Sequence, residues 1–520
     1  MLDYLRRLLT TGFAYTSASV LSKVIAVITL PVYTGLLSSA EYGQAEVLFG
    51  GVVAVSIFVR FGLMEALLRF YYLPDEDGNE VVRSGFAGMF WATTVVAVLL
   101  VPFASLIADP IHSETDLVLI AIGGLWLLTL YEYLLTLLRI DERARAFFFF
   151  TMANVIVTIP VTVLLLTRAD LGAEALLVGS YASAVPFVAY LVWTERRRLA
   201  LVWERSLIRR MLRFGLPTMP AELSLYLLNF ADRVIMVVLL GASVGNATAG
   251  LYAVAFKFSQ SVQIFVRGFQ LAWPPLAYSI TDDGEARRVY SVVTTGFTAF
   301  CALIVVGVWL EARWITDVLT SGTEFDDAYK AVGLLALGAS LYGVYLALLV
   351  ILGRTGRTEF NLPATLAALA INIGLNIWLV PDHGIIGAGL ALAAAYLAAT
   401  VIMYFFTQRL FPVPYQWGRL TVVVVGAAVL IAAGELLLPT EGIEGFALRL
   451  IPIALYPLVL WVGATTAPER AQIRELAHPA VLRERLAEVR ARGEAAGDQP
   501  RAGEEYLRAE AMDEDLRDRS

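Results

Sequence analysis

Cysteine, histidine and lysine are almost absent from this chain of 520 residues. The single cysteine, Cys301, excludes an intramolecular disulfide and any zinc or iron–sulfur site built on several thiolates. The three histidines, His112, His383 and His478, are too far apart for metal-ligand spacing. None of the three lysines follows a glycine, so the sequence lacks a Walker A loop for nucleotide phosphates. We therefore expect neither an ATP-driven pump nor a metal centre.

Charge is also scarce, and the apolar content is high. Charged residues make up 16% of the chain and hydrophobic residues 58%, with a mean hydropathy of +0.70. Ordinary globular chains have roughly 25% charged and 45–50% apolar residues. A soluble fold cannot bury this much apolar surface, so we expect lipid to surround most of the chain. The net charge of −7 gives no indication of nucleic-acid binding.

Long apolar runs predict an all-α, polytopic membrane protein. Each run is near the ~20 residues that a helix needs to cross the hydrocarbon layer. The runs are continuously apolar rather than alternating, which favours helices over a β-barrel. Twelve spans are the main alternative to fourteen. The fourteen expected spans are 11–34, 44–68, 84–108, 117–138, 147–167, 173–194, 213–240, 249–278, 289–310, 328–352, 360–380, 384–408, 418–438 and 446–467.

The distribution of basic residues predicts the orientation. With the N-terminus in the cytoplasm, the cytoplasmic segments before the tail carry 20 lysines and arginines, and the external segments carry three. Cytoplasmic loops of membrane proteins are enriched in these residues. We therefore expect both termini inside. The tail from 468 to 520 has 13 acidic and 10 basic residues, and its apolar spacing predicts a solvated helix, with partner docking or bilayer-surface binding as the alternative.

An internal repeat divides the chain. The string Ile57-Phe58-Val59-Arg60 recurs at residues 264–267, and Gly43 matches Gly250, both at an offset of 207 residues. This offset covers six helices, an even number, so the two copies point the same way across the membrane. We expect one lobe at 1–200, a second at 201–410, two further helices at 411–467 and a charged tail at 468–520. Two similar bundles that face each other form a cleft suited to alternating access.

Charged residues inside the expected spans are the candidate functional groups. A cation at the bilayer centre costs at least ~2.5–3.5 kcal/mol, so such residues face a partner or a cavity. In the first two expected spans of each half, five cations meet three acids, an excess of two positive charges that predicts a basic, water-filled cleft for an anion; internal ion pairing alone is the alternative. Arginine suits phosphate because its planar fork binds two oxygens. The cations are Lys23, Arg60, Arg233, Lys257 and Arg267, and the acids are Glu65, Glu222 and Asp232.

Several strings resemble the polysaccharide flippases of the multidrug/oligosaccharidyl-lipid/polysaccharide exporter superfamily. They are Leu30-Pro31-Val32-Tyr33-Thr34-Gly35 with Glu41-Tyr42-Gly43, Gly62 to Tyr71, Phe214 to Pro217, Asn229 to Arg233, Gly250 to Ala255, and Leu271 to Pro275. The resemblance implies a V-shaped transporter of two six-helix lobes with two extra C-terminal helices. Multidrug members usually carry an acid in the first-lobe cavity, whereas the first span here has Lys23 and no acid.

The resemblance leads to a hypothesis of function. The chain is expected to flip a polyprenyl-pyrophosphate-linked oligosaccharide across the cytoplasmic (inner) membrane for surface polysaccharides such as the lipopolysaccharide O-antigen. The five cations would hold the pyrophosphate and acidic sugars. Without a cofactor, either an H⁺ or Na⁺ gradient that acts through the three acids or downstream consumption of the product would drive transport. Expected partners are the lipid-linked glycan, membrane lipids and other polysaccharide-assembly proteins. The alternatives are a lipid II flippase, a multidrug exporter, or a membrane-embedded glycan polymerase or ligase.

Overall fold

A computed structural model describes residues 17–169, 171–466 and 469–470, and within these residues every regular element is a helix. The chain divides into two compact units, residues 1–457 and 458–520. The expected charged tail lies almost wholly outside the described residues. After an apolar helical segment that begins at Ser17, the α-helices are α2 (Leu30–Leu36), α3 (Ser39–Val59), α4 (Leu63–Phe70), α5 (Gly78–Leu100), α6 (Ala104–Ala108), α7 (Thr115–Ile140), α8 (Ala144–Arg168), α9 (Ala173–Glu195), α10 (Arg205–Gly215), α11 (Met219–Leu228), α12 (Ala231–Leu240), α13 (Ala242–Ser279), α14 (Asp283–Leu310), α15 (Ala312–Leu319), α16 (Tyr329–Thr355), α17 (Asn361–Leu410), α18 (Trp417–Leu437) and α19 (Gly442–Gly463). Short 3₁₀ turns are η1 (Val101–Phe103), η2 (Thr323–Ala328) and η3 (Thr358–Phe360).

Among the described residues, 11 helices are long and apolar enough to cross a membrane, or 12 if the bent pair α11–α12 forms one span. The polytopic all-α prediction is therefore confirmed. The difference from the expected fourteen has two causes. Helix α13 has 38 residues but is too polar to qualify, and α17 joins two expected spans in one run of 50 residues.

The chain reverses inside α17, between the expected spans 360–380 and 384–408. Gly384 has φ 51° and ψ −127°, a left-handed conformation that favours glycine. A Cβ atom on Gly387 would lie 2.6 Å from the carbonyl oxygen of Leu379. Residues eight apart in a straight helix are separated by roughly 12 Å along the axis. The two parts of α17 therefore fold back on each other as two helices.

Two other expected spans are broken. The span expected at 44–68 ends as α3 at Val59, Phe61 and Gly62 have φ of 48° and 68°, and α4 follows. The span expected at 213–240 is divided into α11 and α12, which are bent by 54°. Arg60 is therefore at the end of α3 rather than well inside a helix, whereas its repeat partner Arg267 lies within α13.

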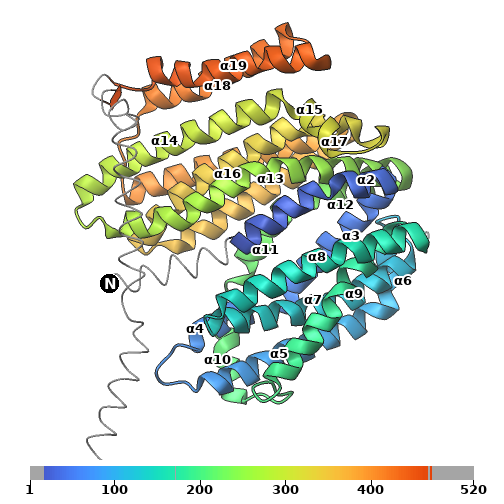
Figure 1. The fold of residues 1–520 in the computed structure, drawn as a ribbon. Coiled ribbons are helices and arrows are strands. Elements are labelled where there is room, and N and C mark those ends of the chain that lie inside the picture. The colour runs from blue at the N-terminus through green and yellow to red at the C-terminus, as the bar shows by residue number, and fades with distance from the viewer. Residues whose placement is uncertain (1–16, 170, 467–468, 471–520) are drawn as a thin grey trace, which may run out of the picture. The chain divides into compact units, whose positions relative to one another are not determined.

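Helices from the two halves of the sequence pack together along α3 and α13 (Figure 1). In the first half α7 packs on α5, α8 and α9, and in the second half α16 packs on α13, α14 and α17. One large apolar core includes Leu48 of α3 and Val254 of α13, so it continues across both halves. We call the end of the bundle where α3 begins the Gly43 end, and the end where α3 finishes the Arg60 end.

Candidate functional site

At the Gly43 end, α3 and α13 touch through Gly43 and Gly250, the two glycines that correspond in the internal repeat. A Cβ on Gly43 would lie 1.9 Å from the Asn246 carbonyl oxygen, and a Cβ on Gly250 would lie 2.0 Å from the Ser39 carbonyl oxygen. Ser39 and Asn246 also differ by 207 residues. The contact is therefore reciprocal, as a two-fold relation between the copies requires. Only glycine lets the two backbones approach this closely.

Lys257 of α13 is paired next to this contact. Its ammonium group donates to the Glu46 carboxylate of α3 at 2.5 Å and also to the Tyr42 hydroxyl. The ion pair joins the two halves of the chain. The side chains of Lys257 and Glu46 are 24% and 19% exposed, so water screens the pair only partly. Lys257 is therefore not an uncompensated cation, because the sequence-based charge balance omitted Glu46.

Arg60 is also paired, at the opposite end of α3. Its guanidinium group lies 3.1 Å from the Glu132 carboxylate of α7 and 3.6 Å from the Glu222 carboxylate of α11. Glu65 is close enough to Glu222 to repel it. Two carboxylates thus face Arg60 and a third lies near Glu222, so acids outnumber cations where the sequence predicts positive charge. The ion pair with Glu222 joins the two halves a second time. Glu132 lies in an expected span but was not among the predicted charged residues.

Lys23 and Arg267 remain without a carboxylate partner among the residues that the structure describes. Lys23 donates to the Gln263 side chain at 3.4 Å, and Arg267 donates to the Gln270 side chain at 2.9 Å. The positive charges of Lys23 and Arg267 are close enough to repel each other. Lys23 is half-buried and Arg267 is exposed. These two cations have the electrostatic character that the sequence predicts for an anion site.

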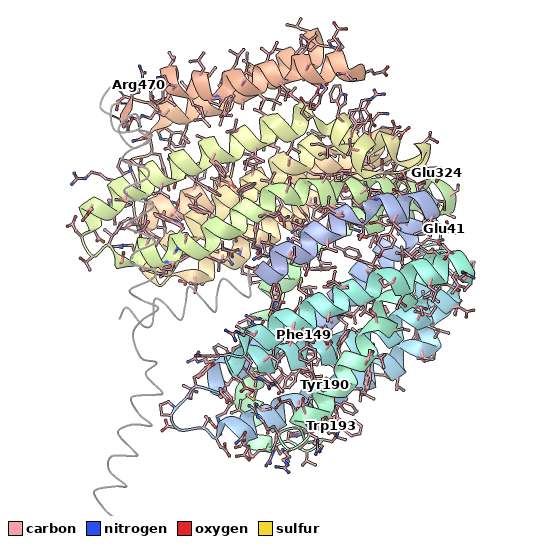
Figure 2. All side chains as sticks on the ribbon, in the orientation of Figure 1. Glu41, Phe149, Tyr190, Trp193, Glu324 and Arg470 are labelled. Atoms are coloured by element: carbon pink, nitrogen blue, oxygen red, sulfur yellow. The ribbon has the colours of Figure 1, made fainter. Side chains whose placement is uncertain are left out.

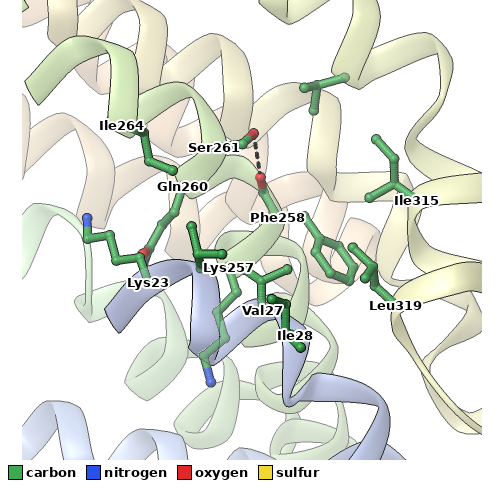
Figure 3. A pocket seen from close by; sticks show the side chains of 12 residues that line it. Lys23, Val27, Ile28, Lys257, Phe258, Gln260, Ser261, Ile264, Ile315 and Leu319 are labelled. Carbon is green, nitrogen blue, oxygen red and sulfur yellow. Dashed lines mark hydrogen bonds between the residues drawn. The ribbon is translucent and has the colours of Figure 1, made fainter. Parts of the chain in front are cut away.

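A pocket lies between the first apolar segment and helices α13, α14 and α15 (Figure 3). Its volume is about 230 Å³. The stems of Lys23 and Lys257 line it, but their ammonium groups point in different directions in Figure 3. Most of the wall is apolar. The remaining lining residues are Val24, Val27, Ile28, Phe258, Gln260, Ser261, Ile264, Val308, Ile315 and Leu319. Its chemistry suits a hydrocarbon chain with a polar group at the Lys23 side.

Asp232 and Arg233 occupy different surroundings. Asp232 is 0% exposed and accepts hydrogen bonds from the Tyr252 hydroxyl and the Asn376 amide, both at 2.6 Å. The Asn372 amide lies beside this carboxylate but forms no hydrogen bond of normal geometry, and the Asn376 carbonyl oxygen is also unpaired. Buried polar atoms are normally hydrogen-bonded, so this group of side chains has unused capacity for a cation or a proton.

Arg233 follows Asp232 in the sequence but forms no ion pair with it among the described residues. It donates to the Asn229 backbone oxygen at 2.8 Å and lies over the rings of Tyr252 and Phe256, with centroid distances of 5.4 and 4.7 Å. It is 6% exposed, and its Nε atom has no partner in the described part of the chain. This cation is buried among aromatic rings rather than presented to a chamber shared with Lys23 and Arg267.

The predicted cluster of five cations is therefore divided. Two are paired with carboxylates, one is buried on aromatic rings, and two remain for an anion. Once the two missed acids, Glu46 and Glu132, are included, five cations face five acids, so the predicted excess of two positive charges was wrong. Both acids lie within expected spans, and counting every acid in those spans would have found them.

Comparisons with known proteins relate this architecture to a family. Residues 32–330, more than half of the chain, match the family described as polysaccharide biosynthesis protein. The probable low-salt glycan biosynthesis flippase Agl15 of Haloferax volcanii is 23% identical over 267 residues, which are 49% of this chain and 54% of that protein. The chain spans about half the length of the curated relatives it matches.

Solved structures show the same fold. A lipid II flippase MurJ in an inward closed conformation has a TM-score of 0.68 and 14% identity, covering 87% of this chain and 97% of that one. An inward-facing multidrug resistance MATE family transporter has a TM-score of 0.61 and 15% identity, covering 76% and 95%. Both are polytopic helical transporters of this architecture. The chain belongs to the polysaccharide biosynthesis protein family.

Proposed function

We propose that the protein flips an anionic, lipid-linked oligosaccharide across the cytoplasmic membrane, with the Arg60 end and both termini in the cytoplasm. The substrate class is a polyprenyl-pyrophosphate-linked glycan for surface polysaccharide synthesis. The observation that carries the proposal is the pair Lys23 and Arg267, two cations that repel each other and have no carboxylate partner in the described residues. A pyrophosphate would neutralise both charges.

The pocket lined by Lys23 supports a division of the substrate. Its apolar wall suits part of the polyprenyl chain, and Lys23 marks the side where the phosphates would begin. The family match and the glycan flippase among the relatives support this substrate class. We also propose that the protein works together with other polysaccharide-synthesis proteins and that the product is a surface polysaccharide such as O-antigen.

Transport in reconstituted vesicles tests this proposal. The substrate is a fluorescent polyprenyl-pyrophosphate glycan, and its movement is followed by quenching from one side. Lys23→Gln and Arg267→Gln should each reduce the initial flipping rate at least tenfold, since a charge-assisted hydrogen bond contributes about 1.5–3 kcal/mol. Lys330→Gln and Arg357→Gln are matched controls, because these cations are paired with nearby acids, Asp327 and Glu359. Equal rates in the site and control variants would refute the anion site.

The driving force in this proposal is an ion gradient that acts through Asp232. Its carboxylate and the unpaired oxygens of Asn372 and Asn376 form an oxygen-rich set of the kind that binds Na⁺ or a proton. Asp232→Asn should abolish stimulation by an imposed Na⁺ or pH gradient but leave substrate binding intact. Gradient-stimulated flipping in this variant would exclude Asp232 and leave Glu65 and Glu222 as the coupling candidates.

Cation export is a second candidate function, because two carboxylates face Arg60 and a third, that of Glu65, lies near Glu222. A lipophilic cation is attracted to a net negative region of this kind. Efflux of a fluorescent cation from cells distinguishes the two functions. The second candidate predicts efflux that depends on Glu132 and Glu222, whereas the glycan proposal predicts accumulation of lipid-linked glycan when the protein is deleted and no cation efflux.

A further inference from the structure

The connection between α9 and α11 has a charge that the transport site does not explain. From Arg196 to Arg213 it holds seven arginines and one acid, Glu204. Arg198 pairs with Asp141 at 2.6 Å, and Arg210 pairs with Glu76 at 2.8 Å. The other five arginines are exposed and meet no carboxylate within the described part of the chain; they are Arg196, Arg197, Arg205, Arg209 and Arg213.

Helix α10 presents three of these arginines in one row. Leu207, Ile208 and Met211 are buried, and α10 packs on α4 and α5. Arg205, Arg209 and Arg213 follow one another at intervals of four residues on the exposed face. Like charges at this spacing destabilise a helix, so the row has no benefit for the fold by itself. An anionic partner would remove the repulsion.

Apolar side chains lie beside the arginines. Leu201, Val202 and Trp203 are 48%, 78% and 43% exposed and lie outside every apolar span of the described chain. The Leu201 carbonyl oxygen accepts a hydrogen bond from the Trp91 indole at 2.9 Å, which holds this segment against α5. Three consecutive exposed apolar side chains outside the spans form a patch of the kind that marks a contact with lipid or another apolar surface.

Aromatic residues mark the level of the membrane interface next to this segment. Phe149, Tyr190 and Trp193, labelled in Figure 2, lie near the Arg60 end of α8 and α9 and are 61%, 53% and 60% exposed. Tyrosine and tryptophan are enriched where hydrocarbon meets headgroups. The Arg196 guanidinium lies 5.0 Å above the Trp193 ring. The arginines therefore begin at the depth where lipid phosphates lie.

We propose that Arg196, Arg197, Arg205, Arg209 and Arg213, with Leu201–Trp203, form a docking surface for anionic phospholipids of the cytoplasmic leaflet. The negative headgroups pair with the arginines, while Leu201, Val202 and Trp203 enter the adjacent apolar layer. An acidic protein segment or nucleic acid would match the charge but leave the three apolar side chains in water. Because α10 connects the two halves of the chain, bound lipid fixes this connection to the membrane surface. The surface is separate from Lys23 and Arg267, so it operates whatever molecule is transported.

Lipid titration of the full chain tests the proposal. Purified protein in neutral detergent is titrated with phosphatidylglycerol or phosphatidylcholine, and bound lipid is counted by native mass spectrometry. A basic residue near a headgroup contributes about fivefold to affinity. The triple variant Arg205→Gln/Arg209→Gln/Arg213→Gln should therefore lose about tenfold to a hundredfold in phosphatidylglycerol affinity and leave phosphatidylcholine binding unchanged.

Two matched variants complete the experiment. Arg288→Gln/Arg357→Gln/Arg409→Gln removes the same charge from the Arg60 end of the other half and should retain phosphatidylglycerol affinity. The arginine-to-lysine triple variant at 205, 209 and 213 keeps the charge and should bind phosphatidylglycerol within a fewfold of the original chain. Equal lipid affinity of the two glutamine variants would overturn the proposal, as would a loss of phosphatidylcholine binding that matches the loss of phosphatidylglycerol binding. Flipping rates are also measured in vesicles of neutral lipid. There the triple glutamine variant at 205, 209 and 213 should flip normally, whereas Lys23→Gln and Arg267→Gln should not, so failure of the lipid surface and failure of the transport site can be distinguished.

Discussion

Replacing Gly43 by alanine should separate α3 from α13 at the Gly43 end. The new Cβ would lie 1.9 Å from the Asn246 carbonyl oxygen, whereas an ordinary Cβ contact is 3.4–4 Å. The helices would therefore move apart by roughly 1.5–2 Å, because the obstacle is backbone. Overpacking of this kind costs about 1–3 kcal/mol. That cost shifts the equilibrium between touching and separated helices about 5- to 150-fold.

A disulfide at the same end reports this shift, because it joins α2, which packs on α3, to the residues before η2, which packs on α13. A Cβ on Gly35 would lie 3.2 Å from the Ser321 Cβ, close to the ~3.5–4.5 Å that a disulfide requires. The pair Gly35→Cys/Ser321→Cys is introduced with Cys301→Ser, which removes the only native cysteine. Gly43→Ala should slow its formation by a factor within the range above.

Gly51→Ala on the same helix is the control, because a Cβ there meets nothing within 4 Å. Both substitutions raise the helix propensity of α3 equally, by about 1 kcal/mol. Only the Gly43 substitution adds the clash with α13. Cross-linking rates that are equal in the Gly43→Ala and Gly51→Ala chains would refute the reasoning.

Three further predictions concern stability. Glu311 is 8% exposed, neither of its carboxylate oxygens is hydrogen-bonded, and burial raises its pKa. Ionising this carboxyl group therefore lowers the stability of the folded state. This loss of stability is absent below the unfolded-state pKa of about 4.3 and grows as pH rises through the folded-state pKa. Glu311→Gln should therefore stabilise the protein by about 1–3 kcal/mol at pH 8 and by much less at pH 4.5, measured as thermal midpoints, and an equal gain at both pH values would contradict this cause. Gly384→Ala should cost about 1–2 kcal/mol because of the left-handed backbone, whereas Gly374→Ala, in helical backbone with no atom within 4 Å of its Cβ, should be neutral or stabilising; similar midpoints would be inconsistent with strain at the turn. Lys257→Met should cost about 3–5 kcal/mol because it leaves Glu46 unpaired, and adding Glu46→Leu should recover much of that loss; no recovery would show that packing, not charge, controls this contact.

Most of the helices were predictable because a bilayer requires long apolar runs. The length of an apolar run, however, does not show where the helix that it forms is broken. The run at 44–68 is mostly apolar and has glycines at 50, 51 and 62, and nothing in its composition shows which of them breaks the helix. The turn at Gly384 was predictable because proline and glycine occur there together between two apolar runs.

The candidate site was less predictable than the fold because charge balance depends on distant partners. Glu46 pairs with Lys257 across 211 residues of sequence, and Glu132 pairs with Arg60 across 72. A residue's span can be read from its neighbours in sequence, but its partner is set by helix packing. The cations that remain for an anion, Lys23 and Arg267, could be separated from the paired ones only once that packing was known.

The reciprocal glycine contact could also act as a pivot for rotation of α3 relative to α13. Gly43 and Gly250 touch at one end of α3, and Arg60 lies 17 residues further along, or roughly 26 Å in a straight helix. A rotation of about 10° around the glycines would move Arg60 by roughly 4–5 Å, more than the 3.6 Å that separates it from Glu222. A rotation of this size would thus be enough to separate the Arg60 guanidinium group from the Glu222 carboxylate.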